Sequence, residues 1–174
     1  ICFVPDGDYA SFIEQYTGQS SKPGDFVNKE GKVLGKHKGQ IHYTIGQRRG
    51  LGISAPESLY VCGKSLDSNE VILGGKQDLM SNYCYINDIN LIPWDHLDAP
   101  IKCKVKTRYR QPEQPATVEQ IGEDLIKITF DEPQRAVTPG QAAVLYDDDM
   151  VLGGGTILPE GLASTMTTSQ GTNN

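Results

Sequence analysis

Turn signals between short β-rich runs are the feature that most limits the fold of this chain. Three of them stand at residues 67–69 (Asp-Ser-Asn), 122–124 (Gly-Glu-Asp) and 147–149 (Asp-Asp-Asp), each between two runs rich in β-branched and aromatic residues. Asp, Asn and Gly tolerate the backbone of tight turns, so each set predicts a β-hairpin. Short strands with turn signals at regular spacing predict a small antiparallel barrel. The expected fold class is therefore mainly β.

One segment, residues 8–17, favours a helix. Asp8 is suited to the N-cap, and Gly18 follows the segment as a stop signal. Apolar residues recur inside it with helical spacing, at Tyr9, Phe12, Ile13 and Tyr16. Further along, residues 20–35 predict a hairpin that turns at 29–31, and residues 41–45 predict a strand between glycines.

The β-rich runs fall into two groups, which predicts two domains. We expect a small β-rich domain with one helix over residues 1–78 and a barrel over residues 79–157. The remaining segment, residues 158–174, is small and polar, and we expect a flexible tail. The chain begins with Ile inside an apolar stretch, which indicates a piece of a longer chain. No apolar run is long enough to span a membrane, and no signal peptide is visible.

The stretch KCKVKTRYR, residues 102–110, places a cation at every second position. Side chains alternate between the two faces of a strand, so all five cations are expected on one face. A solvated outer face is one interpretation. Like charges side by side repel, however, and an unmixed row favours an anionic partner. The row consists of Lys102, Lys104, Lys106, Arg108 and Arg110.

The positive charge of the chain is concentrated in two segments. The formal net charge is −6, yet residues 29–49 and 102–110 hold 11 of the 16 Lys and Arg residues. The rest of the chain is strongly acidic. Basic groups hold phosphates, and tyrosine or arginine planes stack on unpaired bases, so two basic patches with aromatic neighbours favour RNA. The first patch lies among glycines and includes Lys36, His37, Lys38, Tyr43, Gln47, Arg48 and Arg49.

Few residues point to catalysis on their own. The four cysteines lack a C-x-x-C pair, which argues against zinc; they fit a reducing, cytoplasmic setting, although four cysteines can also pair. His37 and His42 lack converging carboxylates and are interpreted as ordinary polar residues. Phosphate-loop and dinucleotide motifs are absent, so neither a nucleotide nor a metal is expected here. Taken alone, Cys2 is interpreted as inert, because Asp6 and Asp8 would raise the pKa of its thiol.

Several segments in order closely resemble the C-terminal half of the bacterial tRNA-specific 2-thiouridylases. They are ICF at residues 1–3, GKHKGQIHYTIGQRRGLGI at 35–53, KTRYR at 106–110, FDEPQRAVTPGQAAVLY at 130–146 and LGGGTI at 152–157. The combination of YTIGQRRGLG with RAVTPGQ is specific to that family. One departure is Ser58-Leu59 before Tyr60, where the family usually has Pro-Trp.

The resemblance implies a fold and an activity for the full-length protein. The implied parts are an N-terminal ATP-pyrophosphatase domain, absent here, then a central domain over 1–78 and a barrel resembling an elongation-factor domain, of the six-stranded antiparallel type, over 79–157. Enzymes of the family use ATP to adenylate the wobble uridine of tRNAs of the Glu, Gln and Lys type. They then replace the activated uridine oxygen with sulfur. A relay protein delivers this sulfur as a cysteine persulfide. Cys2 matches the cysteine that carries this sulfur.

The resemblance also implies tRNA contacts in the barrel, at Arg108, Tyr109 and Gln141. Strict alternation would bury Tyr109, so contact with RNA requires the strand to twist, bulge or end there, and Pro112 makes an ending reasonable. Together with the basic patches, the expected tRNA-binding residues are Arg108, Tyr109, Gln141, Lys36, Lys38, Arg48, Arg49, Lys106 and Arg110.

Three functions follow, in order of preference. The first is a cytoplasmic fragment of a tRNA 2-thiouridylase that binds tRNA and presents Cys2. Because the ATP domain is missing, the fragment is expected to be inactive. We expect ATP to be bound by the missing domain and no cofactor to be bound here. The second is a non-catalytic RNA-binding β-barrel module of the translation-factor kind. The third is an interaction domain with solvated basic faces, which predicts no salt-sensitive tRNA binding.

Overall fold

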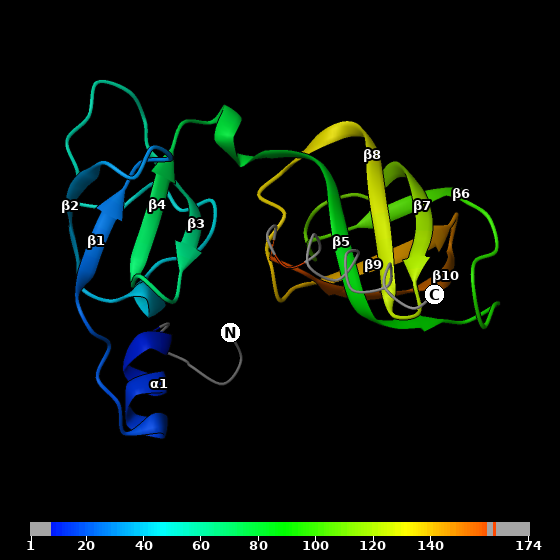
Figure 1. The fold of residues 1–174 in the computed structure, drawn as a ribbon, viewed down its shortest axis with the longest axis horizontal. Coiled ribbons are helices and arrows are strands. Elements are labelled where there is room, and N and C mark those ends of the chain that lie inside the picture. The colour runs from blue at the N-terminus through cyan, green and yellow to red at the C-terminus, as the bar shows by residue number, and fades with distance from the viewer. Residues whose placement is uncertain (1–7, 160–161, 163–174) are drawn as a thin grey trace, which may run out of the picture. The chain divides into compact units, whose positions relative to one another are not determined.

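The computed structural model describes residues 8–159 and residue 162 of the chain. The chain divides into two compact units, Ile1–Leu79 and Met80–Asn174, which Figure 1 shows as ribbons. Cys2 and most of the expected tail, residues 158–174, lie outside the described residues. None of the described helices is long and apolar enough to cross a membrane.

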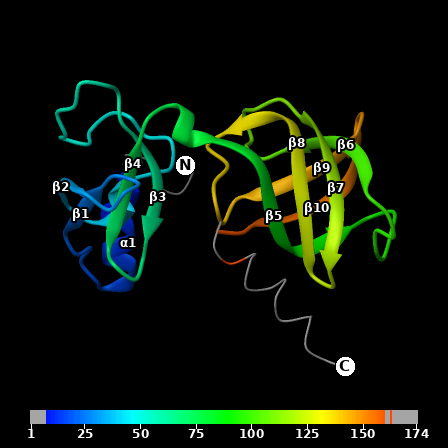
Figure 2. The same ribbon diagram turned by 45° about the horizontal axis from the view of Figure 1, so that its top comes forward.

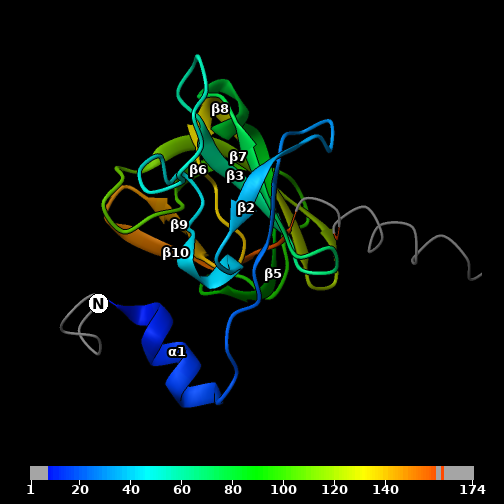
Figure 3. The ribbon, with the colours of Figure 1, turned by 90° about the vertical axis from the view of Figure 1, so that its left-hand side faces the viewer.

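The first unit begins with the predicted helix, α1 (Tyr9–Thr17). Its N-cap is Asp8, whose carboxylate accepts a hydrogen bond from the Ser11 backbone N–H at 3.2 Å, and its C-cap Gly18 is left-handed at φ 66°. Both caps are confirmed. Figure 3 shows α1 lying beyond the strands of this unit, joined to them by a single connecting segment. The apolar side chains of Phe12 and Tyr16 stack on each other and are exposed.

Four strands form the sheet of the first unit: β1 (Gly24–Val27), β2 (Val33–His37), β3 (Tyr60–Ser65) and β4 (Glu70–Gly74). Their order is β2-β1-β4-β3, with β1 and β4 parallel and the other pairs antiparallel. The hairpins predicted at residues 29–31 and 67–69 are both present. Edge-on ring contacts, such as Phe26 against Tyr43 at 5.0 Å between centroids, help to pack the core. That core consists of Phe26, Tyr43, Leu51, Val61, Val71 and Leu73.

The prediction of a strand over residues 41–45 is wrong. A short 3₁₀-helix, η1 (Gln40–His42), and a turn occupy this stretch. Gly39 precedes η1 at φ 129°, and a Cβ atom there would collide with the Ser21 side chain. The Gln40 side-chain amide then donates to the carbonyl oxygen of Ser65 at 2.6 Å. Backbone angles open only to glycine and a tertiary hydrogen bond thus override the local β propensity.

The second unit is a closed barrel of six antiparallel strands, as Figures 1 and 2 show and as expected. A short 3₁₀-helix, η2 (Gln77–Leu79), precedes it. The strand order is β10-β5-β8-β7-β6-β9. The hairpins predicted at residues 122–124 and 147–149 connect β7 to β8 and β9 to β10. The strands are β5 (Met80–Leu91), β6 (Ile101–Lys106), β7 (Gln114–Gly122), β8 (Leu125–Arg135), β9 (Ala142–Asp147) and β10 (Met150–Ile157).

Glycines 153–155 allow β10 to lie close against its neighbours. A Cβ atom on Gly153 would meet the backbone of Asn90 in β5, and one on Gly154 would meet the backbone of Ala143 in β9. The pairing of β10 also shifts register at these residues. Fully buried side chains such as Ile86, Val105 and Leu145 fill the barrel.

Candidate nucleic-acid interface

Strand β6 carries the first three cations of the basic row on its outer face. Val105 is fully buried, while Lys102 and Lys104 are exposed and Lys106 is half-buried. The predicted alternation therefore holds from Ile101 to Lys106. These residues are positioned by the pairing of β6 with β7 on one side and with β9 on the other.

Each lysine of this strand faces a carboxylate from elsewhere in the barrel. Lys102 pairs with Asp131 of β8 at 2.9 Å, and Lys104 pairs with Asp148 of the β9–β10 turn at 2.9 Å. Lys106 pairs with Glu113, which precedes β7, at 3.2 Å. The expectation of an unmixed cationic face is therefore wrong for the strand: each positive charge has a negative one beside it.

The contacts of Lys104 and Lys106 also shift pKa values. The hydrogen bond from Lys104 lowers the pKa of Asp148, and the bond to Asp148 raises the pKa of Lys104. The pKa of Glu113 is lowered, first by a backbone hydrogen bond and then by Lys106. These shifts have the direction expected when an opposite charge lies within hydrogen-bond distance. Lys104 and Asp148 are therefore both charged at neutral pH, and this pair has no net charge.

The basic row changes direction after Lys106. Thr107 is buried, and the backbone N–H of Gln111 donates to the carbonyl oxygen of Arg108 at 3.1 Å, which closes a turn. Tyr109 is 94% exposed at the centre of that turn. The strand ends before Tyr109. Judged from the sequence, contact of Tyr109 with RNA requires a twist, a bulge or an end of the strand at this residue. The expectation that all five cations share one strand face is wrong beyond Lys106.

Arg108 and Arg110 differ from the lysines in their surroundings. Arg108 is half-buried and Arg110 is exposed. Neither guanidinium forms an ion pair with a residue that the structure describes, from 8 to 159 and 162. Two uncompensated positive charges therefore flank an exposed aromatic ring. We call residues 108–110 the RYR turn.

Gln141 lies at the same end of the barrel as the RYR turn. Strands β6 and β9 are antiparallel and pair Lys104 with Tyr146 and Lys106 with Val144. The residue just before β9 therefore lies beside the residues just after β6. Gln141 is exposed, and its backbone is fixed because its carbonyl oxygen accepts from the Ile157 N–H at 2.8 Å. Only the family resemblance pointed to Gln141, because strand pairing cannot be read from one sequence.

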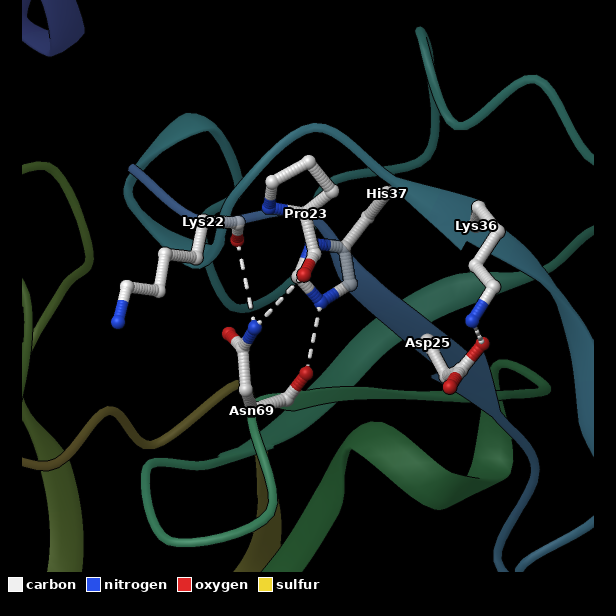
Figure 4. A network of polar contacts seen from close by, with 6 residues as sticks. All are labelled: Lys22, Pro23, Asp25, Lys36, His37 and Asn69. Carbon is white, nitrogen blue, oxygen red and sulfur yellow. Dashed lines mark hydrogen bonds and ion pairs between the residues drawn. The ribbon is translucent and has the colours of Figure 1, made fainter. Parts of the chain in front are cut away.

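The basic residues of the first unit are also exposed. Lys36 pairs with Asp25 at 2.7 Å, as Figure 4 shows. Lys38, Arg48 and Arg49 form no ion pair with any described residue. Arg48 lines an open cavity of about 340 Å³ together with residues 50–53 and 55–59. This patch therefore has free positive charge in its loops and compensated charge on its strand.

Both ring nitrogens of His37 form hydrogen bonds within the fold, in keeping with its interpretation as a structural residue (Figure 4). Its Nδ1 accepts from the Gly39 backbone N–H at 3.0 Å, so Nε2 carries the proton and donates to the Asn69 carbonyl oxygen at 3.1 Å. The Asn69 side chain in turn donates to the carbonyl oxygen of Pro23 at 2.9 Å. A buried imidazole with both nitrogens occupied has none left for a metal or a proton transfer.

The described thiols are free but not activated. Burial raises the pKa of Cys84 to about 12 and that of Cys103 to about 11, and burial also raises the pKa of Cys62. All three remain protonated at neutral pH, and a protonated thiol is a poor nucleophile. None of the three is paired in a disulfide. Cys2, the candidate sulfur carrier, lies outside the described residues.

The glycine run of the barrel does not form a phosphate loop. In loops of that kind, successive glycine N–H groups point into open space toward the phosphates. The densest glycine run, residues 153–155, lies in strand β10 with its Cα atoms against neighbouring backbone. No reaction step that involves ATP can be assigned to these residues.

Two protein families match the chain, one for each unit. Residues 10–75 match the family described as "tRNA methyl transferase PRC-barrel domain". Residues 81–157 match the family described as "Aminomethyltransferase beta-barrel domain". Both matches agree with the division of the structure at Leu79 and Met80.

Curated relatives extend this similarity across both units. The chain is 45% identical to the tRNA-specific 2-thiouridylase MnmA of Carboxydothermus hydrogenoformans over 157 residues, which are 90% of this chain and 43% of that protein. The same enzyme of Clostridioides difficile is 45% identical and that of Acetivibrio thermocellus 46%, each over 90% of this chain and 44% of the relative. The chain thus spans less than half the length of these relatives and matches their C-terminal part.

Proposed function

Because the chain belongs to the tRNA-specific 2-thiouridylase family, of which it carries the PRC-barrel and β-barrel domains, we propose that it is the tRNA-binding part of a sulfurtransferase. The complete enzyme would make 2-thiouridine at the wobble position of tRNA, using ATP and a cysteine persulfide. The observation that carries the proposal is identity of 45% across both domains to proteins with that name. ATP would be bound outside this chain.

The RYR turn and Gln141 form the primary tRNA contact in this proposal. Arg108 and Arg110 would hold phosphates, because a guanidinium presents several N–H donors to one phosphate. The exposed ring of Tyr109 would stack on an unpaired base, as found where proteins bind single-stranded RNA. Gln141 would add a neutral hydrogen bond at the same end of the barrel.

A second contact would come from the first unit. Lys38, Arg48 and Arg49 are free of ion pairs with described residues, so their charge is available to phosphates. Lys36 and Lys106 would first have to leave Asp25 and Glu113. We therefore rank these two lysines below the arginines as tRNA contacts.

The proposed role of Cys2 is to carry the persulfide sulfur that replaces the uridine oxygen. A relay protein would deliver that sulfur, and the modification would take place in the cytoplasm. The ATP-dependent activation of the uridine lies outside this chain, so we expect the chain alone to be inactive. The three described thiols are too buried to substitute for Cys2.

The proposal is tested by fluorescence anisotropy with an unmodified tRNA that carries a wobble uridine, across a salt series. We expect binding that weakens steeply with salt, because phosphate contacts release counterions. Absence of binding at low salt would count against a tRNA-binding role for this chain.

A non-catalytic RNA-binding module is the second candidate, and one observation favours it. The described residues contain no activated thiol, and both ring nitrogens of His37 form hydrogen bonds within the fold. Incubation with a persulfide donor and mass spectrometry separates the two candidates. The sulfurtransferase proposal predicts one added sulfur on Cys2 and none on the buried Cys84. A module without catalytic function predicts no sulfur on either.

A further inference from the structure

A hydrogen bond between two glutamine side chains, one buried and one half-buried, joins the RYR turn to the barrel. Gln134, near the end of β8, is only 5% exposed. Its side-chain oxygen accepts from the Gln111 side-chain amide at 2.6 Å, and its own amide donates to the Glu132 carbonyl oxygen at 2.7 Å. Gln111 belongs to the β6–β7 connection, so this bond joins two segments that are 23 residues apart in the sequence.

The bond between Gln111 and Gln134 lies where it can fix the position of the RYR turn. Gln111 is the last residue of the turn, because its backbone N–H donates to Arg108. Buried Thr107 precedes the turn. Tyr109 is exposed and shows no interaction of its own with a described residue, so its direction depends on these two ends.

We propose that Gln111 and Gln134 are positioning residues that hold the RYR turn ready for RNA. The inference rests on the proposed function and deepens it. A loop that is ordered before binding loses less conformational entropy on binding. Gln134 supplies a buried acceptor whose own amide is bonded to the β8 backbone, and Gln111 links the turn to it. Neither glutamine needs to touch RNA for this role.

The opposite end of the barrel offers a matched control. Gln120, near the end of β7, accepts from the Leu97 backbone N–H at 2.9 Å and donates to the Gly122 carbonyl oxygen at 3.2 Å. It therefore fastens a connection, the segment between β5 and β6, with the same chemistry. That connection carries none of the proposed tRNA contacts. Gln120→Met should leave tRNA affinity unchanged.

The test is a double-mutant cycle in tRNA affinity, measured with the unmodified wobble-uridine tRNA. Gln111→Met removes the donor and keeps the length of the side chain, and we expect about three- to tenfold weaker binding, the effect of one hydrogen bond. In a Tyr109→Ala background the same change should cost much less, because the positioned ring is already absent. Equal losses in both backgrounds, or no loss in the first, would overturn the inference.

A second readout does not need RNA. In the free chain, ¹⁵N relaxation should show lower order parameters at Tyr109 and Arg110 in Gln111→Met, and unchanged values in Gln120→Met. Unchanged order at the turn would refute the positioning role even if affinity fell. The proposed function fails separately: it fails if the unsubstituted chain shows no salt-sensitive tRNA binding, whereas the inference alone fails if such binding is present and Gln111→Met does not alter it.

Discussion

The two halves of the stretch from Lys102 to Arg110 have similar composition and opposite surroundings. On strand β6, each lysine faces a carboxylate at 2.9–3.2 Å. In the RYR turn, two arginines without ion pairs to described residues flank a ring that is 94% exposed. The first half resembles an ordinary solvated surface, and the second half has the free charge and the exposed ring that the proposed RNA contact requires.

This difference shows that the number of charged residues in a segment does not tell how many of the charges are available to a phosphate. A surface ion pair contributes little to stability, but it cancels the local field that would attract a phosphate. The partners Asp131, Asp148 and Glu113 come from three other places in the barrel. Strand pairing brings Asp131 and Asp148 to β6, whereas Glu113 lies in the β6–β7 connection, seven residues from Lys106. We therefore propose that the turn, and not the strand, contacts RNA.

The largest expected effect is that of Tyr109→Ala. Loss of a stacked base costs about 1–3 kcal/mol, so tRNA binding should weaken roughly tenfold or more. The dependence of log Kd on log salt should not change, because no charge is removed. Anisotropy titrations at several salt concentrations measure both quantities. Tyr83→Ala is the control, since Tyr83 is also exposed but lies on strand β5; an equal loss there would contradict the account.

The next largest effect is on the salt dependence of tRNA binding, and it should distinguish the RYR turn from strand β6. Arg108→Ala should weaken binding about fivefold and lower the salt slope by about one contact. Lys102→Ala removes the same charge from the strand, where Asp131 already compensates it, and should change the slope little. The same titrations decide between the two. If both variants lower the slope equally, the distinction between strand and turn is wrong.

A smaller effect should appear when a lysine is released from its carboxylate. Asp148→Asn frees Lys104 and keeps the turn, because Asn tolerates the φ of 48° at this position. RNA binding should then strengthen about twofold with a slightly steeper salt slope. The gain should be the same for tRNA and for an unrelated RNA. Binding that stays constant would mean that the ion pairs do not limit the strand.

The smallest effect is on proton binding. Lys104 lowers the pKa of Asp148 below the ordinary aspartate value of 3.8. The pair therefore contributes stability above that pH and loses it as the pH falls through the lowered pKa. In Lys104→Ala, NMR titration of the Asp148 carboxyl should give a midpoint close to 3.8. In Lys102→Ala the midpoint should stay low. An unchanged midpoint in Lys104→Ala would contradict the pairing.

The sequence predicted the parts of the fold that depend on near neighbours. Asn69 and Asp148 adopt positive φ in the turns predicted for them, and Asp8 caps the predicted helix. Local patterns failed where distant contacts decide. The stretch Ile41–Ile45 has strand composition, yet Gly39 and the bond from Gln40 to Ser65 turn the chain away.

The site was predicted unevenly for the same reason. Alternation located the lysines on one face of β6 but could not reveal their carboxylate partners, which follow from strand pairing. It also could not show where the strand ends, and this decides that Tyr109 is exposed. Gln141 lies beside the RYR turn only because β6 and β9 pair.

The most direct test of the account is an NMR titration of the ¹⁵N-labelled chain with the unmodified wobble-uridine tRNA at moderate salt. The account predicts that the backbone signals of Arg108, Tyr109, Arg110 and Gln141 shift or broaden first, while those of Lys102 and Lys104 stay close to their free positions. Early changes along β6 with a silent RYR turn would contradict it, because the compensated strand and not the free turn would then be the surface that binds RNA.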